Sequence, residues 1–163
     1  MREENKQGLR YSYVLKCIVI VSAVVGIILS ARGGRNSFMG GHTVFMYFTI
    51  QSNLLIALLC LIGFRMAGRS DVSRAWYIIQ FVGTVAITLT GVVFCVVLAL
   101  TLGPAAWKLN NVLTHVVVPL AAIFDLFVSG RGGDLRRIDI LWVTVPPILY
   151  ACYAGIGYVK HWN

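Results

Sequence analysis

Charged residues are scarce in this 163-residue chain, in which Asp, Glu, Lys and Arg make up only 12% of the residues. Soluble domains usually carry about 25% charged residues. The hydrophobic content is 58%, and much of it is gathered into long runs. This balance excludes an ordinary soluble domain and predicts one integral membrane domain over residues 1–163.

The chain also lacks the residue spacings that mark metal sites. Its four cysteines lie within apolar segments, and no CxxC or Cys/His pattern appears. We expect no metal or cofactor, and we expect the cysteines to be buried as small hydrophobic residues. The net charge of +8 forms no single basic stripe, which argues against nucleic acid. Membrane lipids are the expected partners, and the sequence leaves the oligomeric state open.

Five apolar runs are long enough to cross a bilayer as helices, for which about 20 residues are needed. They predict an all-α, polytopic transmembrane helical bundle with spans at residues 13–30, 43–64, 76–102, 110–128 and 138–159. The third run is longer than necessary, so we expect it to be tilted. Ser22, Gly26 and Ser30 recur every four residues and predict close helix packing. Pro146 and Pro147 predict a kink near the middle of the fifth span.

The basic residues outside these runs are distributed unequally between the two sides of the membrane. The segments before span one, between spans two and three, and between spans four and five carry nine, against four on the other side. The positive-inside rule therefore places the N-terminus in the cytoplasm and the C-terminus outside. We expect an integral membrane protein, located in the cell membrane if its source is bacterial.

Hydrophilic side chains in the second span are candidates for function, because the bilayer core supplies no water to bond them. Thr49, Ser52 and Asn53 share one helix face at spacings of three and four residues. Gln51 points about 200° away from Thr49 and needs a different partner. The polar face is unusual in a run of this hydrophobicity.

The fourth span carries a histidine at a depth that matches this polar face. Thr49 and His115 both lie roughly 8–9 Å below the outer end of their spans, which run in the same direction. The hydroxyl and the imidazole can meet if the two spans are neighbours. Asn111 lies one turn above His115 and is a candidate for fixing its tautomer.

Asp125 lies in the same span, roughly 15 Å deeper than His115 and about 80° around the helix. We do not expect its carboxylate to orient the imidazole. Two interpretations remain open. Asp125 is an anchor paired with Arg65 or Arg131, or it is a group that titrates within the membrane in a proton-coupled transporter.

Three segments resemble the signatures of a group of bacterial six-span integral membrane proteins of uncharacterised function. They are residues 47–55 (YFTIQSNLL), residues 89–93 (LTGVV), and residues 115–119 (HVVVP) with Phe124 and Asp125. That group is distantly similar to the eukaryotic androgen-induced transmembrane proteins. The resemblance implies a sixth span, so we expect that the C-terminal span is missing from this chain.

The androgen-induced transmembrane proteins hydrolyse fatty acid esters of hydroxy fatty acids with an intramembrane threonine nucleophile and a histidine base. Carried onto this chain, the resemblance implies Thr49 as the nucleophile and His115 as the base. The chemistry is reasonable, because a threonine hydroxyl becomes a good nucleophile when a nearby imidazole takes its proton. Ser52, Asn53 and Asn111 are candidate donors to the developing oxyanion.

The favoured function is therefore threonine- and histidine-dependent hydrolysis of lipid esters. One alternative is a proton-coupled transporter or a ligand-binding membrane protein that uses Asp125, and another is a non-catalytic assembly partner. Purely structural roles are also open for each candidate residue. Thr49 and Ser52 can bond to carbonyls of their own helix, and His115 and Asn53 can bond between helices.

Overall fold

The computed structural model describes residues 2–33, 41–67, 69, 71–129 and 135–160, and its regular elements in this part of the chain are all helical. Five helical rods are long and apolar enough to cross a membrane, which confirms the all-α bundle. These rods are Lys6–Ala31, Phe48–Met66, Arg74–Trp107, Leu109–Val128 and Arg137–Val159. Each overlaps one predicted span. The second begins later than expected, because residues 41–46 form a separate 3-10 helix, η1 (Gly41–Met46).

Several rods change helix type along their length. The first two are the continuous α-helices α1 (Arg2–Ala31) and α2 (Phe48–Met66). The third comprises α3 (Arg74–Val93), the π-helical η2 (Phe94–Leu98), α4 (Ala99–Leu102) and the 3-10 helix η3 (Gly103–Trp107). The fourth comprises α5 (Leu109–Val112), the π-helical η4 (Leu113–Val117) and α6 (Val118–Val128). The fifth comprises the 3-10 helix η6 (Arg137–Thr144) and α7 (Val145–Val159).

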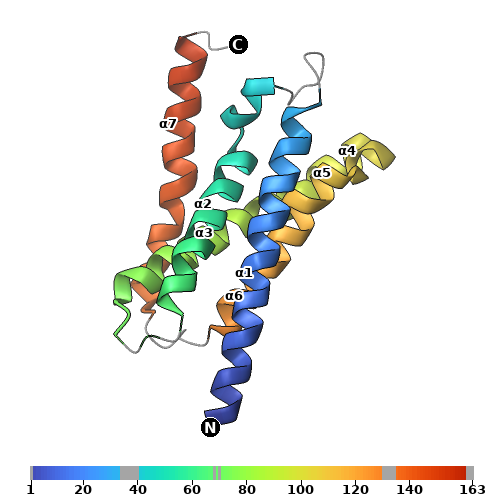
Figure 1. Ribbon diagram of the computed structural model, residues 1–163. Helices are drawn as coiled ribbons and strands as arrows, with labels where there is room; N and C mark the ends of the chain where they lie inside the picture. The colour runs from blue at the N-terminus through green and yellow to red at the C-terminus, as the bar shows by residue number, and fades with distance from the viewer. Residues whose placement is uncertain (1, 34–40, 68, 70, 130–134, 161–163) are drawn as a thin grey trace.

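Four of the rods form the core, and the fifth stands beside them. Residues of α1, α2, α3 and α6 make one buried cluster, in which Val19, Ile56, Ile87 and Val118 are central. α7 contributes no buried residue and lies apart from α1 and α6 (Figure 1). Figure 1 also shows α3 inclined to α1 and α7, as expected from the length of this span. We refer to the end where α1 ends and α2 begins as the upper end, and to the N-terminal end as the lower end.

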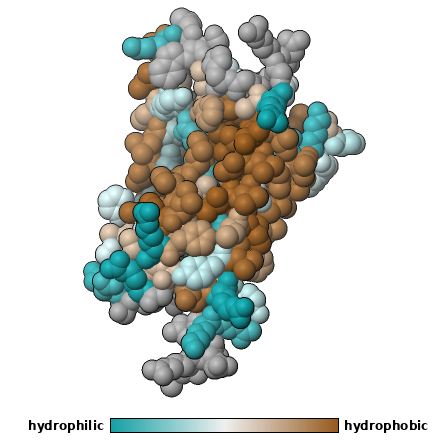
Figure 2. Space-filling model, in the orientation of Figure 1, coloured by the Kyte–Doolittle hydropathy of each residue, from teal (hydrophilic) through white to brown (hydrophobic). Residues whose placement is uncertain are grey.

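The outer surface of the bundle is apolar over most of its height. Figure 2 shows hydrophobic residues across the middle and hydrophilic residues gathered toward the two ends. Soluble monomers rarely expose continuous apolar patches larger than a few hundred Å². Cys17, Cys95 and Cys152 lie on exposed surface, and only Cys60 is buried, so the expected burial is wrong for three of the four cysteines. An apolar environment outside the bundle lets a cysteine face outward without a solvation cost.

Small residues bring the helices into close contact, as the sequence predicts for Gly26. A β-carbon at Gly26 would lie 2.6 Å from Thr114 Cγ2, so α1 packs directly against η4. A second close contact joins α3 to η4. A β-carbon at Gly91 would lie 2.7 Å from the backbone carbonyl oxygen of His115 and 3.1 Å from Pro119 Cγ. These glycines set the depth to which the fourth rod enters the bundle.

Prolines mark two of the changes in helix type. Pro119 has no N–H, so the usual bond to the carbonyl of His115 cannot form, and the π-helical η4 ends two residues before it. Pro146 and Pro147 lie in the first turn of α7, where η6 meets α7. The interruption that these prolines predict therefore takes the form of a change from 3-10 to α-helix. A proline in the first turn removes an N–H that has no partner within the helix.

The contact at Gly91 generates a prediction about stability. Gly91→Ala places a methyl group against backbone, which cannot move as a flexible side chain would, and we expect a loss of about 1–3 kcal/mol in the free energy of unfolding. Gly155→Ala is the matched control, because no atom lies within 4 Å of a β-carbon at that position in α7. Unfolding midpoints in detergent micelles would measure both. Equal midpoints for the two variants would contradict the contact.

Candidate functional site

His115 lies in the upper half of the bundle and is held from two sides. Its side chain projects from η4, and the residue is buried. The imidazole ring stacks on Phe94 of η2, with ring centroids 4.3 Å apart and planes 25° from parallel. Trp107 packs its ring edge against the same phenylalanine. The imidazole therefore lies where the π-helical segments of the third and fourth rods meet.

Hydrogen bonds select one tautomer of His115. Nδ1 lies 3.1 Å from the backbone carbonyl oxygen of Asn111 and 2.9 Å from Thr114 Oγ1. The carbonyl can only accept, and the Thr114 hydroxyl already donates to the carbonyl of Asn110. Nδ1 therefore carries the proton, and Nε2 keeps its lone pair. Among the described residues, Nε2 has no hydrogen-bond partner.

Asn53 joins the turn of α2 that carries Thr49 to the turn of η4 that carries His115. Its Nδ2 donates to the carbonyl of Thr49 at 2.8 Å and to the carbonyl of Thr114 at 3.2 Å. Those two carbonyl oxygens are therefore no more than 6.0 Å apart. The second and fourth rods are therefore neighbours at this level, as a site formed by Thr49 and His115 requires.

The Thr49 hydroxyl differs from those of most other threonines in the bundle. Hydroxyls of five others donate to a carbonyl of the preceding helix turn, namely Thr88, Thr90, Thr101, Thr114 and Thr144. Thr49 is half-buried, and its hydroxyl makes no hydrogen bond to any described residue. The structural role considered for Thr49, a bond back to its own helix, is not the one this structure shows.

The candidate oxyanion donors are largely engaged with the backbone. Ser52 donates its hydroxyl to the carbonyl of Thr49, and Asn53 uses both amide hydrogens on two carbonyls. Asn111 uses one amide hydrogen on the carbonyl of Ala106, and its second has no partner among the described residues. Asn111 also contacts the imidazole through its backbone carbonyl and not through its side chain, which corrects the expected means of fixing the tautomer.

Gln51 finds the separate partner that its direction on α2 requires. Its Nε2 donates to the carbonyl of Phe45 at 3.1 Å, away from the face that carries Thr49 and Asn53.

Asn53 Oδ1, in contrast, is fully buried and accepts no hydrogen bond within the described part of the chain. A buried acceptor without a donor costs about 1–3 kcal/mol. This oxygen therefore marks a position where a donor from water or a bound molecule would be favourable.

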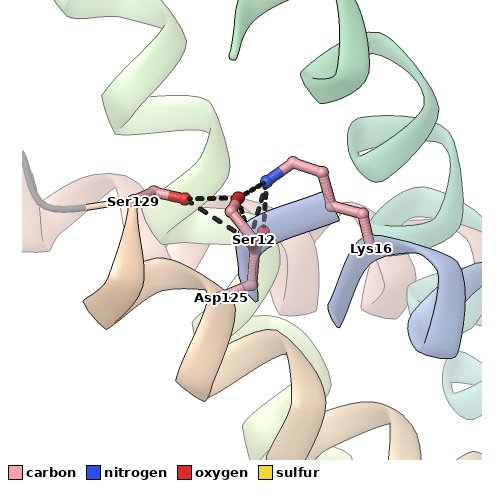
Figure 3. A network of polar contacts seen from close by, with 4 residues as sticks. All are labelled: Ser12, Lys16, Asp125 and Ser129. Carbon is pink, nitrogen blue, oxygen red and sulfur yellow. Dashed lines mark hydrogen bonds and ion pairs between the residues drawn. The ribbon is translucent and has the colours of Figure 1, made fainter. Parts of the chain in front are cut away.

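A second polar cluster lies in the lower half of the bundle and contains Asp125 (Figure 3). Lys16 Nζ donates to both carboxylate oxygens of Asp125 at 2.7 Å and to Ser12 Oγ at 2.6 Å. Ser12 in turn donates to Asp125 Oδ1 at 2.6 Å. Lys16 and Asp125 are only 2% and 4% exposed. Both charges are thus neutralised inside the protein by a pair that ties α1 to α6.

The anchor interpretation of Asp125 is favoured, but with a different partner from those expected. The carboxylate pairs with Lys16 and not with Arg65, and Arg131 lies outside the described residues. Lys16 lies inside the first apolar run, where hydropathy patterning does not single it out. A signal was available, since Lys16 and Asp125 are each only a few residues from the predicted cytoplasmic end of their spans. Two opposite charges at matched depth in lipid are expected to pair.

The lysine stem also contacts α2. A β-carbon at Gly63 would lie 2.7 Å from Lys16 Cε, so the side chain crosses α2 at a position that only glycine leaves open. A cavity of about 10 Å³ adjoins Asp125 and is lined in part by Cys60, Gln80 and Thr84. That volume is about enough for one water molecule. With its charge neutralised by Lys16, Asp125 is not presented as a free acid to a transported substrate.

Comparison with known proteins adds no assignment, because no family model, curated protein or solved structure matches the chain. The described residues contain no group of three His, Cys, Asp or Glu side chains able to hold a metal ion. The fold and surface define the class, which is an all-α, helical integral membrane protein. Its polar groups lie in two clusters, an upper one around His115 and a lower one around Asp125.

The buried ion pair predicts strong coupling between its partners. Asp125→Asn leaves the Lys16 ammonium buried without a counterion, and Lys16→Met leaves the carboxylate, so we expect each to cost about 3–5 kcal/mol of unfolding free energy. In the double variant no unpaired charge remains. Its loss of unfolding free energy should therefore be far below the sum of the losses in the two single variants. Thermal unfolding in detergent of the four proteins forms a double-mutant cycle.

Asp71→Asn provides the control for this cycle, because Asp71 pairs with Arg69 on the exposed surface at 3.2 Å. Losing that pair should leave the unfolding midpoint unchanged, since solvent screens it. Additive effects of the Lys16 and Asp125 substitutions would show that the two charges do not depend on each other.

Proposed function

We propose that this membrane protein hydrolyses lipid esters, with Thr49 as the nucleophile and His115 as the general base. The observation that carries the proposal is the state of the imidazole. Nδ1 is fixed as a donor to the carbonyl of Asn111, so the lone pair of Nε2 is available to accept a proton. Both hydrogen-bond partners of Nδ1, Asn111 and Thr114, lie on the same rod as His115, so these hydrogen bonds do not join two helices.

The state of Thr49 supports the same proposal. Its hydroxyl does not donate a hydrogen bond to a carbonyl of its own helix. Asn53 bridges the turn that carries Thr49 to the turn that carries His115. Proton transfer requires the Thr49 hydroxyl and Nε2 of the neighbouring turn to come within hydrogen-bond distance. Catalytic hydrogen bonds are often long before substrate binds and tighten in the complex.

The proposed reaction proceeds through an acyl-enzyme. Nε2 takes the proton of the Thr49 hydroxyl as Oγ1 attacks the carbonyl carbon of the ester. The tetrahedral intermediate collapses, and the alcohol leaves with the proton returned by the imidazolium, which leaves the acyl group esterified to Thr49. Water then attacks this ester with His115 again as the base, and the fatty acid departs as Thr49 recovers its proton.

Two further groups fit this scheme. The unused amide hydrogen of Asn111 is the remaining candidate donor to the oxyanion, because those of Ser52 and Asn53 are engaged with carbonyls. The orphan acceptor Asn53 Oδ1 lies on the residue that bridges the two turns and offers a hydrogen bond to the water of the second step. With the N-terminus in the cytoplasm, as the distribution of basic residues predicts, this site would lie toward the outer side of the membrane, near the depth of lipid ester groups.

Substitution of the two reacting residues tests the proposal. Purified protein in lipid nanodiscs would be given a panel of lipid esters, including fatty acid esters of hydroxy fatty acids, and released fatty acid would be measured. Thr49→Ala and His115→Gln should each lower turnover by about 10²-fold or more, and Thr49→Ser should retain part of it. The acyl-enzyme should appear on the Thr49 peptide by mass spectrometry.

Thr101→Ala is the matched control, because Thr101 is an exposed threonine that bonds only to its own helix. Its turnover should equal that of the unsubstituted protein. Ester hydrolysis that survives in both Thr49→Ala and His115→Gln would remove the nucleophile and base assignments.

A further inference from the structure

A cleft of about 330 Å³ separates α7 from α2 and α3. Its walls come from the upper half of α2 and the lower part of α7, with Ala86 of α3 at its back. Figure 1 shows α7 running alongside α2 on the side away from α1. Both helices belong to rods that are long and apolar enough to cross a membrane, so we expect lipid and not water around this cleft. We call it the α2/α7 cleft.

The lining of the α2/α7 cleft changes from polar to apolar along its length. Gln51 and Tyr153 lie toward the upper end, whereas Leu55, Pro146 and Leu149 lie one turn or more further down their helices. Gln51 is the fourth residue of α2, roughly 5 Å below the start of this helix. The cleft thus has a polar end at the depth of lipid carbonyl groups and an apolar end toward the middle of the bilayer.

This polarity decides what fills the space. An empty cleft of this size is unfavourable, because its walls lose the dispersion contacts that an occupant would supply. Water is disfavoured at the apolar end, where Leu55, Pro146 and Leu149 offer no side-chain hydrogen bonds. A helix of a second copy would need a groove open along the whole length of α7, but Phe48 and Tyr150 narrow this one with ring centroids 5.2 Å apart.

Gln51 supplies the polar recognition at the upper end. One of its amide hydrogens donates to the carbonyl of Phe45, which fixes the side chain. The second amide hydrogen has no acceptor among the described residues. A glutamine held in this way presents a directed N–H to a carbonyl oxygen that enters the cleft.

We propose that the α2/α7 cleft binds one acyl chain of an ester-linked membrane lipid, with the ester carbonyl hydrogen-bonded to Gln51 and the chain lying against Leu149. Ser52 also lines the cleft, so the cleft adjoins the proposed catalytic face of α2, but Gln51 and Leu55 lie on a different face from Thr49 and Asn53. The bound lipid closes α7 against the other four rods, which it otherwise contacts little. The proposal stands or falls independently of ester hydrolysis.

Photolabelling tests the site directly. The protein would be placed in phosphatidylcholine nanodiscs that contain a phospholipid with a diazirine on its acyl chain, and adducts would be mapped by mass spectrometry. We expect adducts on the α7 peptide and on the α3 peptide with Ala86, a residue only 2% exposed that ordinary lipid around the bundle does not reach. The ether-linked analogue should label these peptides less, because it lacks the carbonyl.

Three variants separate a specific site from the general lipid shell. Leu149→Trp fills the cleft and should abolish the Ala86 adduct, whereas Ile156→Trp, on the same helix but outside the cleft, should leave it unchanged. Leu149 and Ile156 are 64% and 52% exposed, so neither change disturbs the core. Gln51→Leu should bring labelling by the ester lipid down to the level of the ether analogue.

Equal labelling in Leu149→Trp and Ile156→Trp would overturn the proposal, since it would show only the general lipid shell. Cross-linked dimers joined through α7 in place of lipid adducts would assign the cleft to a second copy and would also overturn it.

Discussion

Every polar group in the middle of this bundle has to find its partner inside the protein, because a bilayer core supplies no water. The Lys16–Asp125 pair meets this requirement most completely. The Lys16 ammonium donates three hydrogen bonds, two to the Asp125 carboxylate and one to Ser12. The Ser12 hydroxyl in turn donates a hydrogen bond to the same carboxylate. The pair holds the first rod at a fixed height against the fourth. It therefore also sets the height of the polar side chains of η4, which belongs to the fourth rod.

The same requirement makes the upper cluster informative. The lower cluster is closed, whereas the upper one leaves four groups without a partner among the described residues. They are His115 Nε2, the Thr49 hydroxyl, Asn53 Oδ1 and one amide hydrogen of Asn111. Close packing at Gly26 and Gly91 holds the segment in place, so these open groups are not a consequence of loose packing. π-helical segments often occur at functional sites, and here one of them carries His115 while another carries Phe94, on which the imidazole stacks. The proposed hydrolysis depends on these open groups, of which Asn53 Oδ1 is fully buried.

Much of the fold was predictable from the sequence, because run length and hydropathy determine membrane spans almost alone. Close packing at Gly26 was also predictable from the recurrence of small residues. The predictions that were wrong or incomplete concern Lys16 and the cysteines, and both depend on tertiary contacts. Lys16 was taken as part of an apolar run, although its long stem can cross a helix and reach an acid on another. Whether a cysteine faces the core or the lipid cannot be read from composition, since both environments are apolar.

The candidate site was predictable in part. Matching depths brought the turns of Thr49 and His115 to the same level, and the Asn53 bridge shows that these turns are neighbours. The sequence could not show that a backbone carbonyl, and not the Asn111 side chain, holds the imidazole. Such a bond depends on the π-helical geometry of η4, which hydrophobic patterning does not encode. The sequence could not show the cleft between α7 and α2 either. An apolar helix surface has a similar composition whether it faces another helix or lipid.

The central claim is that His115 is a neutral imidazole with its proton on Nδ1 and an available lone pair on Nε2. Nitrogen-15 NMR of the histidine-labelled protein in nanodiscs measures this state directly, with His115→Gln used to assign the signal. The account predicts a protonated Nδ1 and an unprotonated Nε2 at neutral pH. A His115 signal with the proton on Nε2, or with protons on both nitrogens, would contradict it.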